Sequence, residues 1–240
     1  MDTYTTENLF EGALTIRQKR KGYRFTIDPV LLAHFVRPGA NDKVVDLGTG
    51  SGIIPLILSH RYSELTVTGL EIQESLAELA KENISVNGLS NKITLIHCDM
   101  TDPKVLSRLA QTNLVVANPP YTRHIAGRIN PIQEKALARH EITITLPQLI
   151  LTASDILEPG GCFALIFPHD RLSELLLVLG DENFEPNRMR VVHPKKDGPP
   201  RRVLIESVKC GIKGCVIEPP LFIFEDHGVY SDEVAGMFAG

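Results

Sequence analysis

The stretch KVVDLGTGSG, residues 43–52, is an apolar run that ends in three glycines, and the residues after it have a helical pattern. Glycine lets the backbone approach a ligand closely, and the first turn of a helix presents free amide groups. The spacing GxGxG lacks the GxGxxG of dinucleotide-binding folds. Asp46, just before the glycines, is poorly suited to a phosphate and well suited to an ammonium group. Many strand-to-helix turns carry glycine for structural reasons alone, so this loop needs support from elsewhere.

Outward from this stretch, apolar strands alternate with amphipathic helices. The pattern predicts strands at 43–50, 65–72, 92–99, 113–118, 162–168, 188–194 and 201–211, and helices at 52–62, 74–88, 103–110, 145–157 and 171–179. Such alternation implies right-handed crossovers and a parallel sheet between two layers of helices. The last two strands flank a basic turn and are predicted to pair antiparallel. We therefore predict an α/β, Rossmann-like fold, with a seven-stranded mixed sheet, helices on both faces and an antiparallel C-terminal hairpin.

Local signals place the beginnings of three helices. Thr145 and Gln148 have the spacing of a capping box, in which each side chain bonds the backbone amide of the other residue. Asp102 is predicted to cap the short helix that begins at Pro103, and Asp170 to cap the helix that follows it.

Residues 1–40 do not follow the alternation of strands and helices. We predict that they form an N-terminal extension, or flap, packed on a domain of residues 41–240. Within the extension, Asp28 and Pro29 begin a short helix, PVLLAHFV, which we place over the strand ends.

The composition is that of one globular domain with additions. A chain of 240 residues with 43% hydrophobic content can bury a full core. No apolar run approaches the roughly 18 residues that span a bilayer, and the polar, acidic N-terminal segment lacks a signal-peptide pattern, so we expect a cytoplasmic protein. The histidines and cysteines show no metal-ligand spacing, and no metal site is predicted.

The four cysteines form no CxxC pair. We predict buried, reduced thiols, with a disulfide inside CGIKGC (210–215) as the alternative. The cysteines are Cys98, Cys162, Cys210 and Cys215.

Acidic residues stand at three successive predicted strand ends. Glu71 follows Asp46 by twenty-five positions, and a carboxylate there can accept hydrogen bonds from both hydroxyls of a ribose. Asp99 and Met100 end the third strand and could hold an adenine ring by its amine and its face. Together the three strand ends predict a site for a nucleoside cofactor.

The fourth strand is followed at once by two prolines, in the segment LVVANPPYTR (114–123). Proline breaks both helices and sheet ladders, so the chain must leave the sheet here. The carboxyl end of a buried parallel strand is where such sheets usually hold their ligands. The segment is therefore a candidate site, although a plain turn after a strand would have the same pattern.

The motifs DLGTGSG, LEI, CDM and NPPY occur in that order and resemble class I S-adenosylmethionine-dependent methyltransferases of the NPPY type. The resemblance spans residues 43–170. GYRFTIDPVLLA near the start, ARHE at 138–141 and VVHPKKDGPPRRVLIE near the end are similar to a narrower group. That group comprises the tRNA adenine methyltransferases that act on the adenosine beside the anticodon of a valine tRNA.

The resemblance implies S-adenosylmethionine as cofactor, with Asp46, Gly48 and Gly50 around its methionine moiety, Glu71 at the ribose, and Asp99 with Met100 at the adenine. Thr49, Ile72 and Asn118 complete the implied cofactor site. It also implies that Asn118, Pro119, Pro120 and Tyr121 hold the target amine.

The NPPY motif suits methylation of an exocyclic amine, whose lone pair is delocalised into its ring. If the Asn118 side-chain oxygen and the Pro119 carbonyl accept the two amine hydrogens, the nitrogen becomes more tetrahedral and its lone pair is freed. The prolines stiffen the loop so that both acceptors are placed in advance. Tyr121 would stack on the base, an interaction worth roughly 1–3 kcal/mol. The base must be unstacked or flipped, which is easiest in an anticodon loop.

Basic residues cluster in two segments although the net charge is −4. We predict that they contact tRNA phosphates, with a solvated face that has no partner as the alternative. The predicted phosphate contacts are Lys19, Arg20, Lys21, Lys195, Lys196, Arg201 and Arg202.

Several nearby residues have more than one interpretation. The resemblance places Phe25 and Asp28 over the cofactor, while core packing for Phe25 and helix capping for Asp28 fit the sequence as well. Arg139, His140 and Glu141 could order the loop after NPPY or lie at a solvated helix end.

Two other functions fit the same core. A protein glutamine methyltransferase uses the NPPY chemistry on a release factor, but such proteins carry an extra helical domain, and here only about forty residues precede Asp46. A catalytically silent S-adenosylmethionine-binding module would keep the pocket without turnover. The oligomeric state and the exact nucleotide are not predicted.

Overall fold

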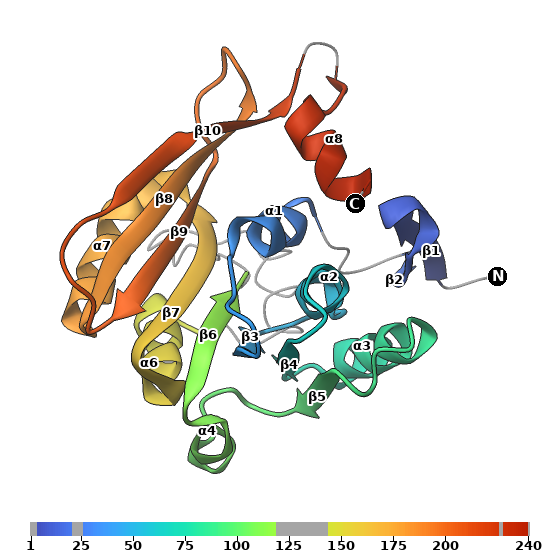
Figure 1. Ribbon diagram of the computed structural model, residues 1–240, viewed down its shortest axis with the longest axis horizontal. Helices are drawn as coiled ribbons and strands as arrows, with labels where there is room; N and C mark the ends of the chain where they lie inside the picture. The colour runs from blue at the N-terminus through green and yellow to red at the C-terminus, as the bar shows by residue number, and fades with distance from the viewer. Residues whose placement is uncertain (1–3, 21–25, 119–143, 226–227, 240) are drawn as a thin grey trace, which may run out of the picture.

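Eight strands form one mixed sheet in the order β10-β8-β9-β7-β6-β3-β4-β5 (Figure 1). The computed structural model describes residues 4–20, 26–118, 144–225 and 228–239. Strands β3 to β7 run parallel, β9 is antiparallel to both β7 and β8, and β10 is parallel to β8. The strands are β3 (Lys43–Leu47), β4 (Thr66–Glu71), β5 (Ile93–His97), β6 (Thr112–Ala117), β7 (Leu157–Pro168), β8 (Phe184–Lys195), β9 (Arg202–Lys209) and β10 (Val216–Phe224).

Helices cover both faces of this sheet, and the strand residues alternate between two apolar cores (Figure 1). Val44 lies in the core with α1 and α2, whereas Val45, its neighbour, lies in the core with α6 and α7. This period of two is expected of strands buried on both faces. The helices are α1 (Asp28–Phe35), α2 (Ile53–Arg61), α3 (Glu74–Val86), α4 (Pro103–Leu109), α6 (Leu146–Ile156), α7 (Leu172–Asp181) and α8 (Asp232–Ala239).

The predicted fold class is confirmed, and the sheet has one strand more than the seven predicted. The additional strand, β10, contains Pro219 and Pro220, which the sequence pattern disfavours in a sheet. β10 lies at the edge, and its pairing register shifts between Glu218 and Leu221, where the two prolines fall. An edge strand with a bulge tolerates proline because one side of its backbone needs no partner.

A second, two-stranded sheet precedes the main one and was not predicted. It consists of β1 (Tyr4–Leu9) and β2 (Leu14–Lys19), joined by the 3-10 turn Phe10–Gly12. Alternate residues of β2, Leu14 and Ile16, are buried in the core that contains α1 and α2. The domain boundary at residue 40 stays a prediction.

Helix α1 is a core helix rather than the flap over the strand ends that we expected. Six of its eight residues are buried, Pro29 among them, and it packs against α2 and β7. A helix that is apolar nearly all round is stable only when it is covered on several sides. The buried apolar residues are Val30, Leu31, Leu32, Ala33 and Phe35.

Two of the three predicted helix caps are confirmed. Thr145 and Gln148 form the capping box of α6, and Asp102 accepts a hydrogen bond from the Lys104 amide at the start of α4. The prediction for Asp170 is wrong because the chain first takes a 3-10 turn, His169–Arg171. The Leu172 amide donates to the His169 carbonyl and closes that turn, so α7 begins one residue later than predicted.

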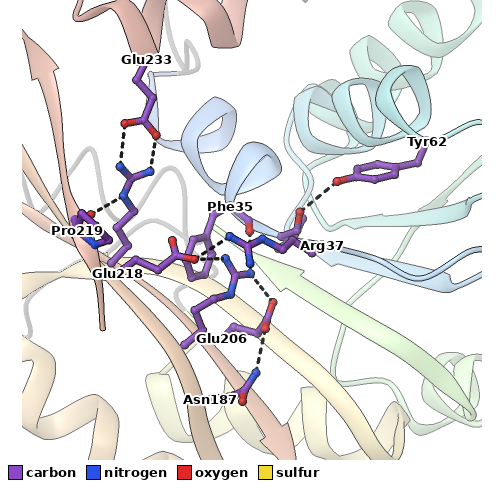
Figure 2. A network of polar contacts seen from close by, with 11 residues as sticks. Phe35, Arg37, Tyr62, Asn187, Glu206, Glu218, Pro219 and Glu233 are labelled. Carbon is purple, nitrogen blue, oxygen red and sulfur yellow. Dashed lines mark hydrogen bonds and ion pairs between the residues drawn. The ribbon is translucent and has the colours of Figure 1, made fainter. Parts of the chain in front are cut away.

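A buried group of charged side chains fixes the edge strand β10 (Figure 2). The Arg188 guanidinium lies between Glu206 of β9, at 2.9 Å, and Glu218 of β10, at 3.2 Å. It also donates to the Phe35 carbonyl, at 2.8 Å, and its central carbon lies 4.0 Å from the centre of the Phe35 ring. Arg37 adds a second ion pair to Glu218, at 2.8 Å. Charges thus join β10 to β9 and to the end of α1.

The four cysteines are free thiols, as predicted, but they are less buried than expected. Burial is the main reason that the pKa values of Cys98 and Cys162 rise to about 11, and both side chains are half-buried. Cys210 and Cys215 are exposed because they flank the connection between β9 and β10. In the described ranges no helix has the length and apolar character to cross a membrane, and no His, Cys, Asp and Glu side chains gather as metal ligands.

Candidate functional site

The strand order reverses between β3 and β6, and the predicted site residues follow the carboxyl ends of these strands and of β4 and β5. Asp46 of β3 lies opposite Gly69 of β4 and Val116 of β6 in the ladder. Asn118 directly follows Ala117, which pairs with Leu47. In open α/β sheets, ligands bind outside the strand ends at such a reversal. The topology therefore brings the glycine loop and Asn118 to one edge of the sheet.

The glycine loop is held in a conformation that only glycine adopts easily. Gly48, Gly50 and Gly52 have φ angles of +77°, +60° and +84°, in the left-handed region. The amides of Gly48 and Thr49 both donate to the Leu70 carbonyl, at 3.0 and 2.9 Å. The loop is therefore fixed against the end of β4, where the next site residue stands.

Glu71 braces this loop through its carboxylate. One oxygen accepts from the Gly50 amide and the other from the Gln73 amide, each at 2.8 Å. The side chain is only 4% exposed. Because each carboxylate oxygen can accept a second hydrogen bond, these contacts leave room for a ribose hydroxyl.

Asp46 carries the most unusual electrostatics of the site. Its side chain is fully buried, and neither carboxylate oxygen has a hydrogen-bond partner among the described residues. Burial is the main reason that its pKa rises to about 7. The nearby Thr49 hydroxyl opposes the rise, although it completes no hydrogen bond to the carboxylate, and the negative charge of Glu71 adds to it. An unpartnered buried carboxylate is costly, so its retention calls for an explanation. A ligand that brings a positive charge or several N–H groups supplies one.

The third strand end is joined to the glycine loop through Met100. A Cβ atom on Gly48 would lie 3.6 Å from the Met100 methyl group. Asp99 is exposed, and its Oδ1 atom accepts from the amide and hydroxyl of Thr101, at 2.8 and 2.7 Å. Ile72 is half-buried, and its carbonyl lies 3.0 Å from the His97 ring. Of the two predicted adenine residues, Met100 therefore lies beside the glycine loop, and Asp99 stabilises the turn that follows β5.

The remaining predicted site residues divide between described and undescribed segments. Asn118 is half-buried at the end of β6. The structure does not describe Lys21, Phe25, Pro119, Pro120, Tyr121, Arg139, His140 or Glu141.

The expectation that Asp28 caps α1 is wrong. The cap position is Ile27, which makes no side-chain capping bond, and the Asp28 carboxylate instead accepts from Arg202 Nε at 2.9 Å. Arg202 stands opposite Pro168, at the carboxyl end of β7, and so lies at the edge where Asn118 leaves the neighbouring β6. An ion pair with a residue 174 positions away competes with the local cap, and no short-range pattern encodes it.

The basic turn after β8 is held by hydrogen bonds between its own residues. Gly198 donates its amide to the Lys195 carbonyl, at 3.1 Å, and its own carbonyl accepts from the His193 ring at 2.8 Å. Lys195, Lys196 and Arg201 are exposed and form no ion pair with the described residues. Of the four predicted cations here, Arg202 is thus committed to Asp28, and three remain accessible.

The other predicted basic residues lie on the hairpin. Lys19 ends β2, and Arg20 donates from Nε to the Tyr4 carbonyl at 3.2 Å. They belong to the separate two-stranded sheet and not to the sheet edge described above.

Asn83 is a site residue that was not predicted. Its side chain is fully buried in α3 and donates to the Ser51 carbonyl in the glycine loop, at 3.0 Å. A signal was present. Asn83 follows Leu76 by seven residues and falls on the apolar face of the helix with Leu79 and Ala80. A polar residue at such a position is expected to have a specific buried partner.

The sheet order and the strand-end site together define an enzyme with the class I methyltransferase fold. The chain belongs to the Methyltransferase small domain family, whose profile matches residues 28–177. This confirms the resemblance that the motifs indicated.

Individual relatives show which members of the family this chain resembles. A protein from Porphyromonas gingivalis named tRNA1(Val) (adenine(37)-N6)-methyltransferase is 32% identical over 218 residues, which cover 88% of this chain and 85% of the relative. A protein of the same name from Parabacteroides distasonis is 31% identical, over 75% of this chain and 74% of the relative. The crystal structure of a predicted O-methyltransferase from Agrobacterium tumefaciens is similar in fold, with a TM-score of 0.69, 22% identity, and coverage of 88% of this chain and 94% of that chain.

Proposed function

We propose that this protein transfers the methyl group of S-adenosylmethionine to N6 of an adenine in tRNA, in the cytoplasm. The proposal is carried by the unpartnered, buried Asp46 carboxylate beside the glycine loop, at the reversal of strand order. The names of the relatives supply the substrate class. A nucleoside cofactor with a cationic amino-acid end would supply a positive charge to Asp46 and ribose hydroxyls to Glu71. Glu71 and the loop amides lie next to Asp46, so one ligand can reach all of them.

The residues at the strand ends fit this cofactor. Asp46 would pair with the ammonium group of the methionine moiety, beside Gly48, Thr49 and Gly50. Glu71 would accept the ribose hydroxyls. S-adenosylmethionine supplies a methyl group made electrophilic by its positively charged sulfur. Ile72, Asp99 and Met100 would hold the adenine.

Asn118 would orient the target amine. Its side-chain oxygen accepts one amine hydrogen and the Pro119 carbonyl accepts the other, so the nitrogen lone pair points toward the methyl group. The N–H bonds become acidic once the nitrogen carries the new methyl group, and one proton then leaves to solvent without a strong base. Tyr121 would stack on the flipped base.

The direct test is methyl transfer to RNA. Purified protein, methyl-labelled S-adenosylmethionine and tRNA should give label in RNA, and nucleoside mass spectrometry should identify N6-methyladenosine. RNA from cells lacking the protein should lack the modification at one site. Label on the glutamine of a release factor would favour the alternative enzyme, and cofactor binding without any labelled acceptor would indicate a silent module.

Asp46→Asn should weaken cofactor binding and stabilise the ligand-free protein. The folded-state pKa of Asp46, about 7, lies above its ordinary value of 3.8. The folded protein therefore holds a proton that the unfolded chain has released, so stability from this group falls as pH rises from about 4 to about 7. The variant should melt at a higher temperature than the natural protein at pH 8, and the difference should vanish near pH 4.

Binding should show the opposite preference, because an ammonium group favours the ionised carboxylate. Isothermal titration calorimetry should show tighter S-adenosylmethionine binding as pH rises through about 7. In Asp46→Asn we expect roughly tenfold or greater loss of affinity at pH 8, with the pH dependence flattened. An unchanged affinity would remove Asp46 from the cofactor site.

The basic turn and the Asp28 ion pair should respond differently to mutation. Neutralising Lys195, Lys196 and Arg201 together should weaken tRNA binding and reduce the salt slope of log K by up to about 3, if each contacts a phosphate. Arg202→Asp should also weaken binding, by displacing the turn. The charge swap Asp28→Arg with Arg202→Asp should restore part of that loss, measured by filter binding. A swap that restores nothing would make Arg202 a phosphate contact.

A further inference from the structure

Two asparagines, Asn83 in the last turn of α3 and Asn87 just after it, hold the N-terminal hairpin by its backbone. The Asn83 side chain accepts from the Arg17 amide at 2.9 Å and donates to the Arg17 carbonyl at 3.2 Å. One helical turn later, Asn87 forms the same two bonds with Thr15, each at 2.8 Å. Thr15 and Arg17 are alternate residues of β2, so the two side-chain amides bond this strand edge as a neighbouring strand would.

Each asparagine forms a third bond, and only that of Asn83 reaches the glycine loop, because the Asn87 side chain donates to the Asn83 carbonyl, at 2.7 Å. The Asn83 Nδ2 atom donates one hydrogen to the Arg17 carbonyl and the other to the Ser51 carbonyl, at 3.0 Å. The side chain is fully buried. Because an amide group is planar, the position of the hairpin and the position of the loop are fixed by one rigid group.

The sequence explains why Ser51 needs this donor. Ser51 lies just before α2, and in a helix its carbonyl would accept from the amide four residues later. That residue is Pro55, which has no N–H. The next carbonyl, that of Gly52, is bonded normally by the Leu56 amide at 3.1 Å. Asn83 therefore replaces the donor that Pro55 removes, and without it a buried carbonyl would be left unsatisfied.

The other bonds that join the loop to a neighbouring element come from β4. The Leu70 carbonyl accepts from the Gly48 and Thr49 amides, and the Glu71 carboxylate accepts from the Gly50 amide. Inside the loop, the Gly52 amide donates to the Thr49 carbonyl at 3.0 Å. The bond from α3 to the half of the loop nearest α2 is thus the one from Asn83, which also holds the hairpin.

We infer that Asn83 is a positioning residue for the cofactor, which keeps the glycine loop in its binding shape and links that shape to docking of the N-terminal hairpin. The inference rests on the proposed function, because it takes S-adenosylmethionine as the ligand of the loop. Asn83 itself touches no reacting atom in this scheme.

Asn87→Ala is a matched control, because it loses the same two hairpin bonds and no bond to the loop. Asn83→Ala should bind S-adenosylmethionine roughly tenfold or more weakly by titration calorimetry, and Asn87→Ala less than about threefold more weakly. Trypsin cleavage after Lys19 and Arg20 should accelerate in both variants, which shows that the hairpin is loosened in each. Equal loss of affinity in the two variants, or none in Asn83→Ala, would overturn the inference.

A rescue experiment tests whether the lost hydrogen bond to the Ser51 carbonyl causes the loss of affinity. Pro55→Ala restores the missing N–H, so the double variant Pro55→Ala with Asn83→Ala should recover affinity to within about threefold of the natural protein. Pro55→Ala alone should bind normally. A double variant as weak as Asn83→Ala would show that the Ser51 bond is not the cause.

Two further measurements distinguish a loss of cofactor affinity from a loss of folding or of turnover. Asn83→Asp retains the acceptor for the Arg17 amide but cannot donate to Ser51, so it should show the same loss and serves if the alanine variant does not fold. At saturating cofactor, kcat of Asn83→Ala on tRNA should stay within about twofold while KM for the cofactor rises. Failure of the natural protein to bind S-adenosylmethionine would instead refute the proposed function.

Discussion

Asn118→Ala should lower methyl transfer to tRNA by roughly 100-fold to 1000-fold, the range seen when one preorganised hydrogen-bonding group is removed from an active site. The amide oxygen of Asn118 is proposed to accept a hydrogen of the target amine, and alanine leaves that hydrogen to water. Affinity for S-adenosylmethionine should change little, because Asp46 and Glu71 would hold the cofactor from neighbouring strands. Single-turnover kinetics and calorimetry measure the two quantities separately.

Asn113→Ala is the control for this prediction. Asn113 lies near the other end of the same strand, where its oxygen accepts from the Lys43 amide at 2.8 Å and its nitrogen donates to Glu158. Its loss should reduce stability and leave the turnover of the folded protein nearly unchanged. Turnover of Asn118→Ala within threefold of the natural rate would contradict the assigned role.

Arg188→Ala should destabilise the fold by about 3–5 kcal/mol, since it leaves buried carboxylates without their partner. The Arg188 side chain is 7% exposed and contacts both Glu206 and Glu218. Removing the cation leaves Glu206 buried without an ion pair to any described residue, and leaves Glu218 with the exposed Arg37 as its remaining cation. The midpoint of urea unfolding, followed by circular dichroism, measures the loss.

Arg190→Ala tests whether burial, and not merely an ion pair, accounts for that effect. Arg190 forms a two-bond pair with Glu233, at 2.6 and 2.8 Å, but Glu233 is 52% exposed. Its loss should cost about 1 kcal/mol or less. Replacing Arg188, Glu206 and Glu218 together with methionine or leucine should recover most of the stability, because no buried charge then remains. Equal effects of Arg188→Ala and Arg190→Ala would contradict the explanation.

Much of the fold could be predicted from the sequence because its signals are local. These signals involve residues within a few positions of one another. Examples are the burial of Val44 and Val45 on opposite faces of the sheet, the glycines after Asp46, and the Thr145 capping box. Such patterns specify strands, turns and helix starts directly. The order of the strand-end motifs then indicated the family, which the profile match confirms.

Features that depend on distant partners could not be predicted in the same way. β10 was missed because Pro219 and Pro220 disfavour a strand locally, while the Arg188 ion pairs and the sheet edge accommodate it. Asp28 was expected to cap its own helix, but Arg202 lies close enough in the fold to take its carboxylate.

The sequence by itself determined the alternating α/β pattern, the glycine loop and the strand ends that carry Asp46, Glu71 and Asn118, because the signal for each lies in neighbouring residues. Only the tertiary structure decided which charges are free and which are paired, and that Asn83 bonds both Arg17 and Ser51. Those choices depend on residues that the chain brings together from far apart, 66 positions for Asn83 and Arg17 and 174 for Asp28 and Arg202. Hydrogen bonds and ion pairs act over a few ångströms in space, and separation along the chain does not reveal which groups come that close.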